Sequence, residues 1–394
     1  MANDVLAAID ERADRIAATG AASEQRGQLD ERAVDLLRET GVMRMFQPAK
    51  YGGAEAHPAD FAESVMAVAA ADGSAGWVAG IVGLHPWELA MADNRVQEEV
   101  WGEDPEVWIA SPYAPMGMLR PVDGGYLFSG RWQFSSGTDH CNWIFLGATV
   151  AGSDGNPDHS AGMRHVILPR SDYEIVADSW DVVGLRGTGS KDIVVEDVFV
   201  PEYRVLAYDR LVDGSAPRDA GIDNPLYHMP FTTVFPAGIT SAVIGICEGA
   251  LAHHLAYQRD RLQITGTKAR EDPYVLSAVG AAAAELRASR IALLDSMRWS
   301  YDEAAAGREL AFADRARNRE TQVAAAWRAV RAMDDVVARS GGNGLRNDNP
   351  MQRFWRDGHM GLAHAIHVPG AVFHASALGR LDIVPPPGPL RSMI

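Results

Sequence analysis

Gly124-Gly125-Tyr126-Leu127-Phe128 is a glycine pair followed by aromatic and aliphatic residues. This pattern is typical of a tight turn that leads into a strand. Further short runs rich in β-branched and aromatic residues follow at positions 143–150, 165–168 and 193–200. We therefore expect a small β domain between about residues 107 and 206.

The sequence on either side of this segment has the spacing of helices. Apolar residues recur at helical intervals from Asp4 to about residue 102 and again from residue 237 to about 338, and an Asp-, Gly- and Pro-rich linker is predicted at 211–230. Because helices and strands are segregated, a Rossmann-type sheet is disfavoured and an α+β, mainly α, fold is expected. The helices predicted before the sheet lie at residues 29–40, 58–71 and 74–92.

The composition excludes several classes of partner. A formal net charge of −16 at pH 7 argues against nucleic acid, because binding phosphates requires a cationic face. The N-terminus lacks the apolar core of a secretory signal, and the apolar run 235–252 contains Glu248 and is too short to span a membrane. Cys141 and Cys247 form no disulfide or metal-ligand pattern. We expect a cytoplasmic protein with no membrane or nucleic-acid partner.

Two motifs in the β segment have the composition of ligand-binding turns. The run from Gly184 to Lys191 resembles a phosphate loop, but it ends Gly-Ser-Lys rather than Gly-Lys-Ser, which excludes nucleotide hydrolysis. It is either an anion-binding turn or a tight β-turn. Ser135-Ser136-Gly137, after Trp132, ends a predicted strand. Its hydroxyls and amides either bind a flat heterocycle or form a simple turn.

Histidines and glycines in the helical parts are the other candidates. His85 lies in an apolar helical stretch, where an imidazole needs a partner. His364 and His367 are three residues apart, which on a helix places them on one face. No carboxylate or cysteine completes a metal-ligand spacing, so no metal is expected, and a hydrogen-bonded core histidine is the alternative for each. In Ser340-Gly341-Gly342-Asn343-Gly344, a helix C-cap explains one glycine, whereas three indicate close approach to a ligand.

Taken in order, the motifs of the chain resemble the acyl-CoA dehydrogenase superfamily from about residue 29 to 382. The matching motifs are Gln47-Pro48-Ala49-Lys50-Tyr51-Gly52-Gly53, the hairpin from Gly125-Tyr126 to Gly130-Arg131-Trp132, Gly184 to Ser190, Val195 to Pro201, Gly341-Gly342-Asn343-Gly344 and Arg356-Asp357. The resemblance implies an N-terminal helical domain at 1–105, a middle β-barrel-like domain at 106–215 and a C-terminal four-helix bundle at 216–394. It also implies a homotetramer.

The chain departs from the dehydrogenases where they carry their catalytic glutamate, because no carboxylate follows Asp357 in this region. Further stretches resemble the two-component (group D) flavin-dependent monooxygenases of the same fold, a branch that includes p-hydroxyphenylacetate hydroxylase and a hydroxylase of a sterol-derived phenol. These stretches are Gly76-Trp77-Val78, His85, residues 98–105 and 113–117, Ser135-Ser136-Gly137, and residues 183–190 and 352–357. An acyl-CoA dehydrogenase or oxidase with FAD remains the alternative, since some place the glutamate on a bundle helix. A non-catalytic flavin-binding scaffold is the second alternative.

By this resemblance, the catalytic candidates are His364, as the active-site acid or base, His85, which lines the flavin and substrate pocket, and Ser136, as a hydroxyl near flavin N5. Ser111 and Ser136 contact flavin, Trp132 belongs to the hairpin over the flavin, and Arg261 binds its phosphate. The remaining implied cofactor contacts are Ser135, Gly137, Gly341, Gly342 and Asn343. His367 and Val368 replace an Asn and an Asp found near the substrate in the sterol branch, so His367 is placed in the substrate pocket while the substrate itself stays open.

The implied reaction uses reduced flavin, FMNH₂ or FADH₂, and O₂ to form a C4a-hydroperoxyflavin that hydroxylates a phenol-like aromatic substrate, a steroid-derived one included. Oxygen transfer to nitrogen or sulfur also occurs in the branch. No Gly-x-Gly-x-x-Gly follows a strand, so the reduced flavin has to come from a separate NAD(P)H-dependent flavin reductase.

Overall fold

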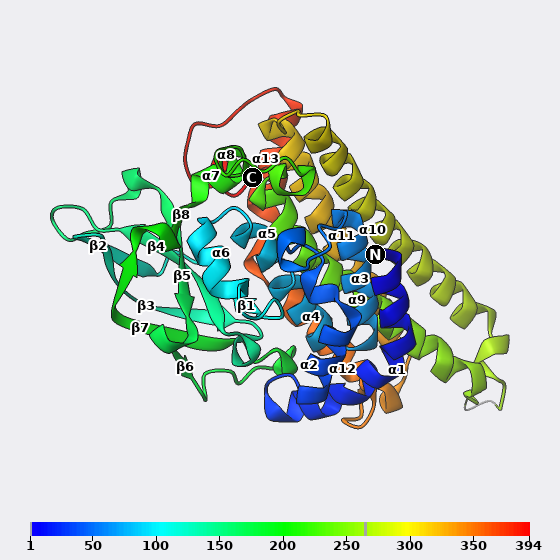
Figure 1. Ribbon diagram of the computed structural model, residues 1–394. Coiled ribbons are helices and arrows are strands. Elements are labelled where there is room, and N and C mark those ends of the chain that lie inside the picture. Colours follow the sequence, from blue (N-terminus) through cyan, green and yellow to red (C-terminus); the bar gives the residue numbers. More distant parts are fainter. Residues whose placement is uncertain (1, 264–265) are drawn as a thin grey trace.

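The computed structural model describes residues 2–263 and 266–394. One sheet stands beside a large body of helices, and helices from both ends of the chain pack together in that body (Figure 1). The helices before the sheet are α1 (Ala2–Arg26), α2 (Glu31–Thr40), α3 (Pro58–Ala71), α4 (Gly73–Val82), α5 (His85–Leu89) and α6 (Asn94–Trp101). The predicted helix at 74–92 is divided between α4 and α5, because Pro86 has no N–H to continue the hydrogen bonding of α4.

The eight described strands form a single sheet. They are β1 (Ile109–Ala110), β2 (Gly117–Val122), β3 (Gly125–Ser135), β4 (Trp143–Val150), β5 (Met163–Pro169), β6 (Glu174–Val176), β7 (Lys191–Pro201) and β8 (Val205–Ala207). The strand order is β6-β7-β3-β2-β4-β5-β8, with β1 paired to β4, so β6 and β8 form the two edges. The turn between β2 and β3 requires Gly124, whose φ of 76° favours glycine.

The second helical part begins directly after the sheet. Its helices are α7 (Tyr208–Val212), α8 (Ser215–Asp219), α9 (Phe231–Asp260), α10 (Pro273–Ala305), α11 (Phe312–Ala338), α12 (Pro350–Leu362), α13 (Pro369–Arg380) and α14 (Pro389–Ser392). Thus the predicted linker at 211–230 contains a short helix. Among the described residues, α9 is the one helix long and apolar enough to cross a membrane, but 83% of its apolar window is buried inside the protein. It is the central helix of the bundle.

Glycines allow α4 to cross α9 at very short distance. A Cβ added to Gly80 would lie 2.6 Å from the carbonyl oxygen of Gly238, and one added to Gly238 would lie 2.3 Å from the carbonyl oxygen of Gly80. A single cluster of buried residues includes Val65 of α3, Trp132 of β3 and Ile244 of α9. The sheet and both helical parts therefore share one core.

The expected fold class, α+β and mainly α, is confirmed, because the chain is mainly helical with a sheet in the middle of its sequence. Strands lie at all the predicted places, within β3, β4, β5 and β7. The strands β1, β2, β6 and β8 were not predicted. The division into units at residues 105 and 215 stays a prediction.

Candidate active site

Ser136, directly after β3, belongs to a chain of hydroxyl groups whose hydrogen bonds all run in one direction. The Thr188 hydroxyl donates to the carbonyl oxygen of Leu185 at 2.8 Å, so it accepts from the Ser190 hydroxyl 2.7 Å away. Because the Ser190 hydroxyl donates to Thr188, the Ser136 hydroxyl has to be the donor in its 2.8 Å hydrogen bond to the Ser190 oxygen. The Ser136 oxygen also accepts the indole N–H of Trp77 at 3.1 Å. It therefore offers a ligand a remaining acceptor site and no donor.

The end of β3 bends sharply just before Ser136. Its pairing with β7 shifts register after Trp132, and Phe134 has a left-handed φ of 69°, which costs an L-residue about 1 kcal/mol. Trp132 is fully buried and donates its indole N–H to the carbonyl of Gly147 at 2.9 Å. Phe134 is 60% exposed and stands edge-on to Trp180. The bend therefore places the Trp132 ring in the interior and the Phe134 ring on the surface.

The remaining residues of this turn pack against α4. Gly137 has a φ of 71°, and a Cβ there would lie 3.0 Å from a methyl group of Val78. Ser135 is fully buried, and its hydroxyl has no hydrogen-bond partner among the described residues. A buried hydroxyl without a partner is a free polar group available to a ligand or a water molecule.

Trp77 on α4 links the Ser136 turn to the segment that follows α12. Its side chain is 5% exposed, and its ring centroid lies 5.8 Å from that of His364. Because its N–H is bonded to Ser136, Trp77 is held between two of the three residues that the sequence predicts to be catalytic, and the third, His85, lies elsewhere. Ser136 and His364, more than 200 positions apart in the chain, therefore flank one indole ring.

His364 caps the short helical turn after α12, and this role fixes its tautomer. Its Nδ1 accepts the main-chain N–H of Ile366 at 3.2 Å, so the proton of the neutral ring is on Nε2. Burial, with a smaller effect of Arg319, lowers the pKa of His364 to about 4. At neutral pH the side chain is therefore an uncharged hydrogen-bond donor through Nε2.

His367 has both ring nitrogens bonded inside the chain. Nδ1 lies 3.1 Å from the carbonyl oxygen of Gly361, so it carries the proton, and Nε2 accepts from the Thr240 hydroxyl at 3.1 Å. The residue is fully buried, and burial lowers its pKa to about 3. This geometry ties the His364 segment to α9 and leaves no ring nitrogen of His367 for a substrate.

His85 and Ser111 form a separate buried pair. His85 Nδ1 donates to the carbonyl oxygen of Ile109, so Nε2, 2.9 Å from the Ser111 oxygen, accepts the hydroxyl proton. Burial lowers the pKa of His85 to about 4, and its ring stands edge-on to Tyr113 with centroids 5.6 Å apart. Ser111 is thus left as an acceptor, in the same way as Ser136.

The predicted phosphate-binding Arg261 and the predicted flavin contacts Gly341, Gly342 and Asn343 meet at the far end of α9. Arg261 donates to the carbonyl oxygen of Arg339 at 3.0 Å, and its guanidinium lies 3.0 Å from where a Cβ of Gly341 would be. Gly341 has a φ of 70°, whereas a Cβ on Gly342 would meet nothing within 4 Å. Asn343 lies in the same turn. Arg261 is 21 positions beyond Thr240, which is about 30 Å along a helix, so these residues do not join His364 within one chain.

Asp357 has a role inside the chain. Its carboxylate is fully buried and accepts the main-chain N–H of Leu185 at 2.5 Å, which fastens the glycine-rich turn to α12. Leu185 has a left-handed φ of 53°, and a Cβ on Gly184 would lie 2.3 Å from the carbonyl oxygen of Arg356. Burial raises the pKa of Asp357 to about 7. This turn also supplies Thr188 and Ser190 to the hydroxyl chain.

Sequence reasoning missed several residues of this site. Trp77 belongs to the conspicuous run Gly76-Trp77-Val78, but nothing in the sequence shows that it contacts Ser136. Thr188 and Ser190 lie in the predicted glycine-rich turn, and that turn's hydroxyls rather than its glycines reach Ser136. Among residues 2–263 and 266–394 there is no group of three His, Cys, Asp or Glu side chains that could hold a metal ion.

Comparison with known proteins adds to this geometry. The family model "Acyl-CoA dehydrogenase, C-terminal domain" matches residues 237–369. The "Pigment production hydroxylase" of Rhodococcus erythropolis is 55% identical over 394 residues, 100% of both chains. The "Flavin-dependent monooxygenase, oxygenase subunit HsaA" of Mycobacterium tuberculosis (strain ATCC 25618 / H37Rv) is 42% identical over 389 residues, 98% of this chain and 97% of that one. The crystal structure of the HsaA monooxygenase from M. tuberculosis matches with a TM-score of 0.92 at 40% identity, covering 100% of both chains.

Proposed function

Because the chain belongs to the flavin-dependent monooxygenases, as an oxygenase component with the acyl-CoA dehydrogenase fold, we propose that it hydroxylates a phenol-like aromatic substrate with reduced flavin and O₂. The observation that carries this proposal is the arrangement around Trp77. An acceptor-only hydroxyl, Ser136, and a neutral donor, His364 Nε2, flank the indole. The substrate is a small aromatic or a steroid-sized phenol.

The Ser136 turn fits the edge of a reduced flavin. In its reduced form the flavin supplies the electrons that activate O₂. Flavin N5 then carries a proton, and Ser136 would accept it, because its own proton is committed to Ser190. The exposed ring of Phe134 and the free hydroxyl of Ser135 border the same turn. Holding the N5 proton in place would slow the loss of peroxide.

His364 would act as a hydrogen-bond donor in this reaction. To act as a base, Nε2 would have to give up its proton and Nδ1 would have to take one, which breaks the bond to Ile366. The low pKa of His364 keeps the ring neutral, so the donated proton stays on Nε2 at neutral pH. His367 and Thr240 position the segment rather than react. His85 and Ser111 add a second acceptor oxygen in the interior.

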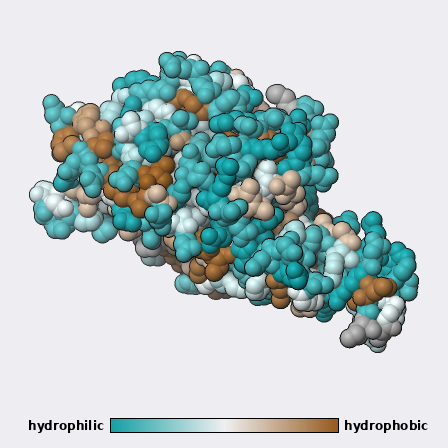
Figure 2. Space-filling view, turned by 90° about the horizontal axis from the view of Figure 1, so that it is seen from below, coloured by the Kyte–Doolittle hydropathy of each residue, from teal (hydrophilic) through white to brown (hydrophobic). Residues whose placement is uncertain are grey.

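We propose a homotetramer in which Arg261, Gly341, Gly342 and Asn343 contact a flavin held mainly by a neighbouring subunit. Their position about 30 Å along α9 from Thr240 supports this, because one chain cannot bring both groups to one small site. The end of the α9–α10 hairpin projects from the body with apolar surface on it (Figure 2). Leu262 is 64% and Tyr274 85% exposed there, as expected of residues covered by another subunit. A monomer in light scattering would refute the tetramer.

The proposed reaction also requires a partner protein. A separate NAD(P)H-dependent flavin reductase would supply the reduced flavin, either in a complex or by diffusion. Cys141 and Cys247 are both free and buried, which supports a reducing compartment such as the cytoplasm.

An acyl-CoA dehydrogenase is the second candidate, and the structure provides a specific argument against it. Such an enzyme needs a glutamate base beside the flavin, and Glu248 is the glutamate of α9. Arg290 donates to its carboxylate at 2.9 Å. This ion pair holds the carboxylate away from the role of a free base. His364 stands after α12 with no carboxylate bonded to it among the described residues.

Flavin affinity in the two redox states tests the proposal. Ser136 offers only an acceptor, so reduced FMN or FAD, with a proton on N5, should bind at least about tenfold more tightly than the oxidised flavin, which has a lone pair there. Equilibrium dialysis under nitrogen measures both. A protein that retains oxidised FAD through dialysis and is bleached by an acyl-CoA would be a dehydrogenase.

A further inference from the structure

Asp357 on α12 lies where the two segments that hold Ser136 meet. One oxygen of its carboxylate accepts the main-chain N–H of Leu185 at 2.5 Å. The other oxygen packs against the start of α4, because a Cβ on Gly73 would lie 2.7 Å from it. The side chain is 2% exposed. A single buried carboxylate therefore contacts both the glycine-rich turn and α4.

Leu185 fixes the first hydrogen bond of the hydroxyl chain. It has a left-handed φ of 53°, which L-residues avoid, and its bond to Asp357 holds it in this conformation. Its carbonyl oxygen then accepts from the Thr188 hydroxyl at 2.8 Å. Without that acceptor, Thr188 would be free to donate to Ser190, and Ser190 to Ser136. The order of the chain would be reversed, and Ser136 would turn its own proton toward a ligand.

The second support of Ser136 begins at the same carboxylate. α4 starts at Gly73, and Trp77 follows one helical turn later. The indole N–H of Trp77 donates to the Ser136 oxygen at 3.1 Å. A carboxylate beside the first turn of a helix is also stabilised by the main-chain N–H groups there. Both fixed hydrogen bonds of Ser136 therefore depend on segments that Asp357 contacts.

The neighbouring Arg356 holds the same turn through different atoms. It donates to the carbonyl oxygen of Val183 and to the carboxylate of Glu24. Neither bond involves a residue of the hydroxyl chain. We therefore expect the turn to stay attached to α12 when the bond between Asp357 and Leu185 is removed. The carboxylate can be changed without releasing the whole turn.

We propose that Asp357 is a positioning residue of the flavin site: by fixing Leu185 it keeps Ser136 a hydrogen-bond acceptor, and the protein therefore prefers reduced over oxidised flavin. The inference rests on the proposed function, which places flavin N5 at Ser136. Reduced flavin carries a proton on N5 and oxidised flavin a lone pair, so the direction of the Ser136 hydrogen bond decides which form is held. Asp357 acts through the hydroxyl chain rather than by touching the flavin.

The test measures how strongly each variant discriminates between the two redox states. Equilibrium dialysis of the full-length protein under nitrogen, against reduced and against oxidised FMN, gives the ratio of the two dissociation constants. At pH 6, below the pKa of about 7 of Asp357, wild type and Asp357→Asn carry the same charge. Asp357→Asn keeps an acceptor for Leu185 and should keep the ratio within about threefold, whereas Asp357→Ala should lower it by at least about tenfold.

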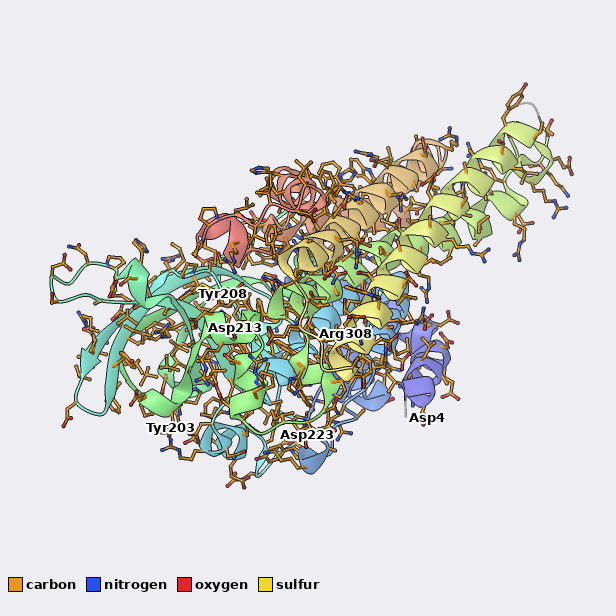
Figure 3. The ribbon with its side chains drawn as sticks, turned by 90° about the horizontal axis from the view of Figure 1, so that it is seen from above. Asp4, Tyr203, Tyr208, Asp213, Asp223 and Arg308 are labelled. Atoms are coloured by element: carbon orange, nitrogen blue, oxygen red, sulfur yellow. The ribbon has the colours of Figure 1, made fainter. Side chains whose placement is uncertain are left out.

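Two further variants assign the effect to the hydroxyl chain. Thr188→Val removes the hydroxyl that links Leu185 to Ser190, so it should lower the ratio as Asp357→Ala does, and the double variant should be no lower than either one. Asp213→Ala is the matched control. Asp213, at the junction of sheet and bundle (Figure 3), also accepts a main-chain N–H, that of Ser215 at 2.8 Å, but it is exposed. This control should change the ratio by less than about twofold.

The outcomes separate this inference from the function on which it rests. A wild-type protein that does not prefer reduced FMN would refute the proposed role of Ser136. A wild-type preference that survives in Asp357→Ala, or effects of Asp357→Ala and Thr188→Val that multiply in the double variant, would overturn the positioning role alone. If Asp357→Ala does not fold, Asp357→Glu takes its place in both comparisons, because it keeps a carboxylate but moves it relative to the N–H of Leu185.

Discussion

Hydrogen-bond direction gives Ser136 its chemical character. Serine hydroxyls ordinarily both donate and accept. Here the Thr188 hydroxyl donates a hydrogen bond to the carbonyl oxygen of Leu185. Ser190 therefore donates to Thr188, and Ser136 donates to Ser190. The same principle makes His364 a donor, because its Nδ1 caps a helical turn.

Ser136→Ala should uncouple the reaction. Without the acceptor for the flavin N5 proton, we expect the ratio of hydroxylated product to hydrogen peroxide to fall by roughly tenfold, the effect of one well-placed hydrogen bond. Ser129→Ala, on the same strand but bonded to the exposed Asp197 at 2.9 Å, is the control and should change the ratio by less than about twofold. Normal coupling in Ser136→Ala would remove Ser136 from the mechanism.

The pH dependence of hydroxylation should show no contribution from His364 between pH 6 and 8. Its pKa is lowered from the ordinary value to about 4, so the neutral ring persists across this range and is lost only as pH falls toward 4. His364→Gln, which also presents an N–H donor, should retain more product formation than His364→Ala. An inflection near pH 6.5 that disappears in His364→Gln would show instead that His364 titrates as an acid or base.

Sequence motifs are local, and this explains which residues of the site could be predicted. Ser136 and His364 were found because each stands in a motif of its own. Trp77, which joins them, is an ordinary helix residue until the fold brings α4 against the end of β3.

At the scale of elements, the position of Trp77 depends on how closely α4 approaches α9. Gly238→Ala should destabilise the protein by about 1–3 kcal/mol, because its Cβ would overlap the carbonyl oxygen of Gly80. Gly280→Ala is the matched control: it lies inside α10 with nothing within 4 Å of its Cβ, so it should be neutral or stabilising by up to about 1 kcal/mol. Urea unfolding measures both. Equal stability of the two variants would refute the close crossing.

The attachment of the glycine-rich turn to α12 predicts a stability that depends on pH. The pKa of Asp357 is raised in the folded protein to about 7, so its favourable contribution is present at acidic pH, below the unfolded value, and is lost as pH rises through 7. Asp357→Asn keeps an acceptor for Leu185 without this loss. Its stability relative to wild type should rise by on the order of 3 kcal/mol from pH 4 to pH 8.

Urea unfolding of both proteins at the two pH values measures this difference. Asp348→Asn is the control, because Asp348 is exposed and pairs with Arg346 at the surface, where such pairs contribute little. A constant difference between Asp357→Asn and wild type would mean that Asp357 stays ionised in the folded protein.

Regular elements were predicted well and irregular ones poorly. The strands of the sheet with strong alternation appeared where expected, since local propensity and burial agree there. The bend at Phe134 and the turn at Leu185 need left-handed φ values of 69° and 53°, which neither residue type signals. Both are imposed by tertiary contacts, and both border the site.

At the scale of the whole molecule, α9 separates the two groups of predicted flavin contacts. Its middle holds the His364 segment through Thr240, and its end carries Arg261 beside Gly341. The sequence places both sets of motifs in order but carries no information on whether one subunit brings them together. Gly342 in that turn faces open space within the described chain, since a Cβ there would meet nothing within 4 Å.

The most direct test of the monooxygenase reading follows the oxygen atom. The protein is mixed with FMNH₂ or FADH₂ under nitrogen, ¹⁸O₂ is admitted, and the phenols 4-hydroxyphenylacetate, resorcinol and estradiol are examined by mass spectrometry. We predict that one of them gains a single ¹⁸O atom and that flavin reoxidation is slower than in free solution. Reoxidation at the rate of free flavin, with all the oxygen recovered as hydrogen peroxide and no labelled product, would contradict the account.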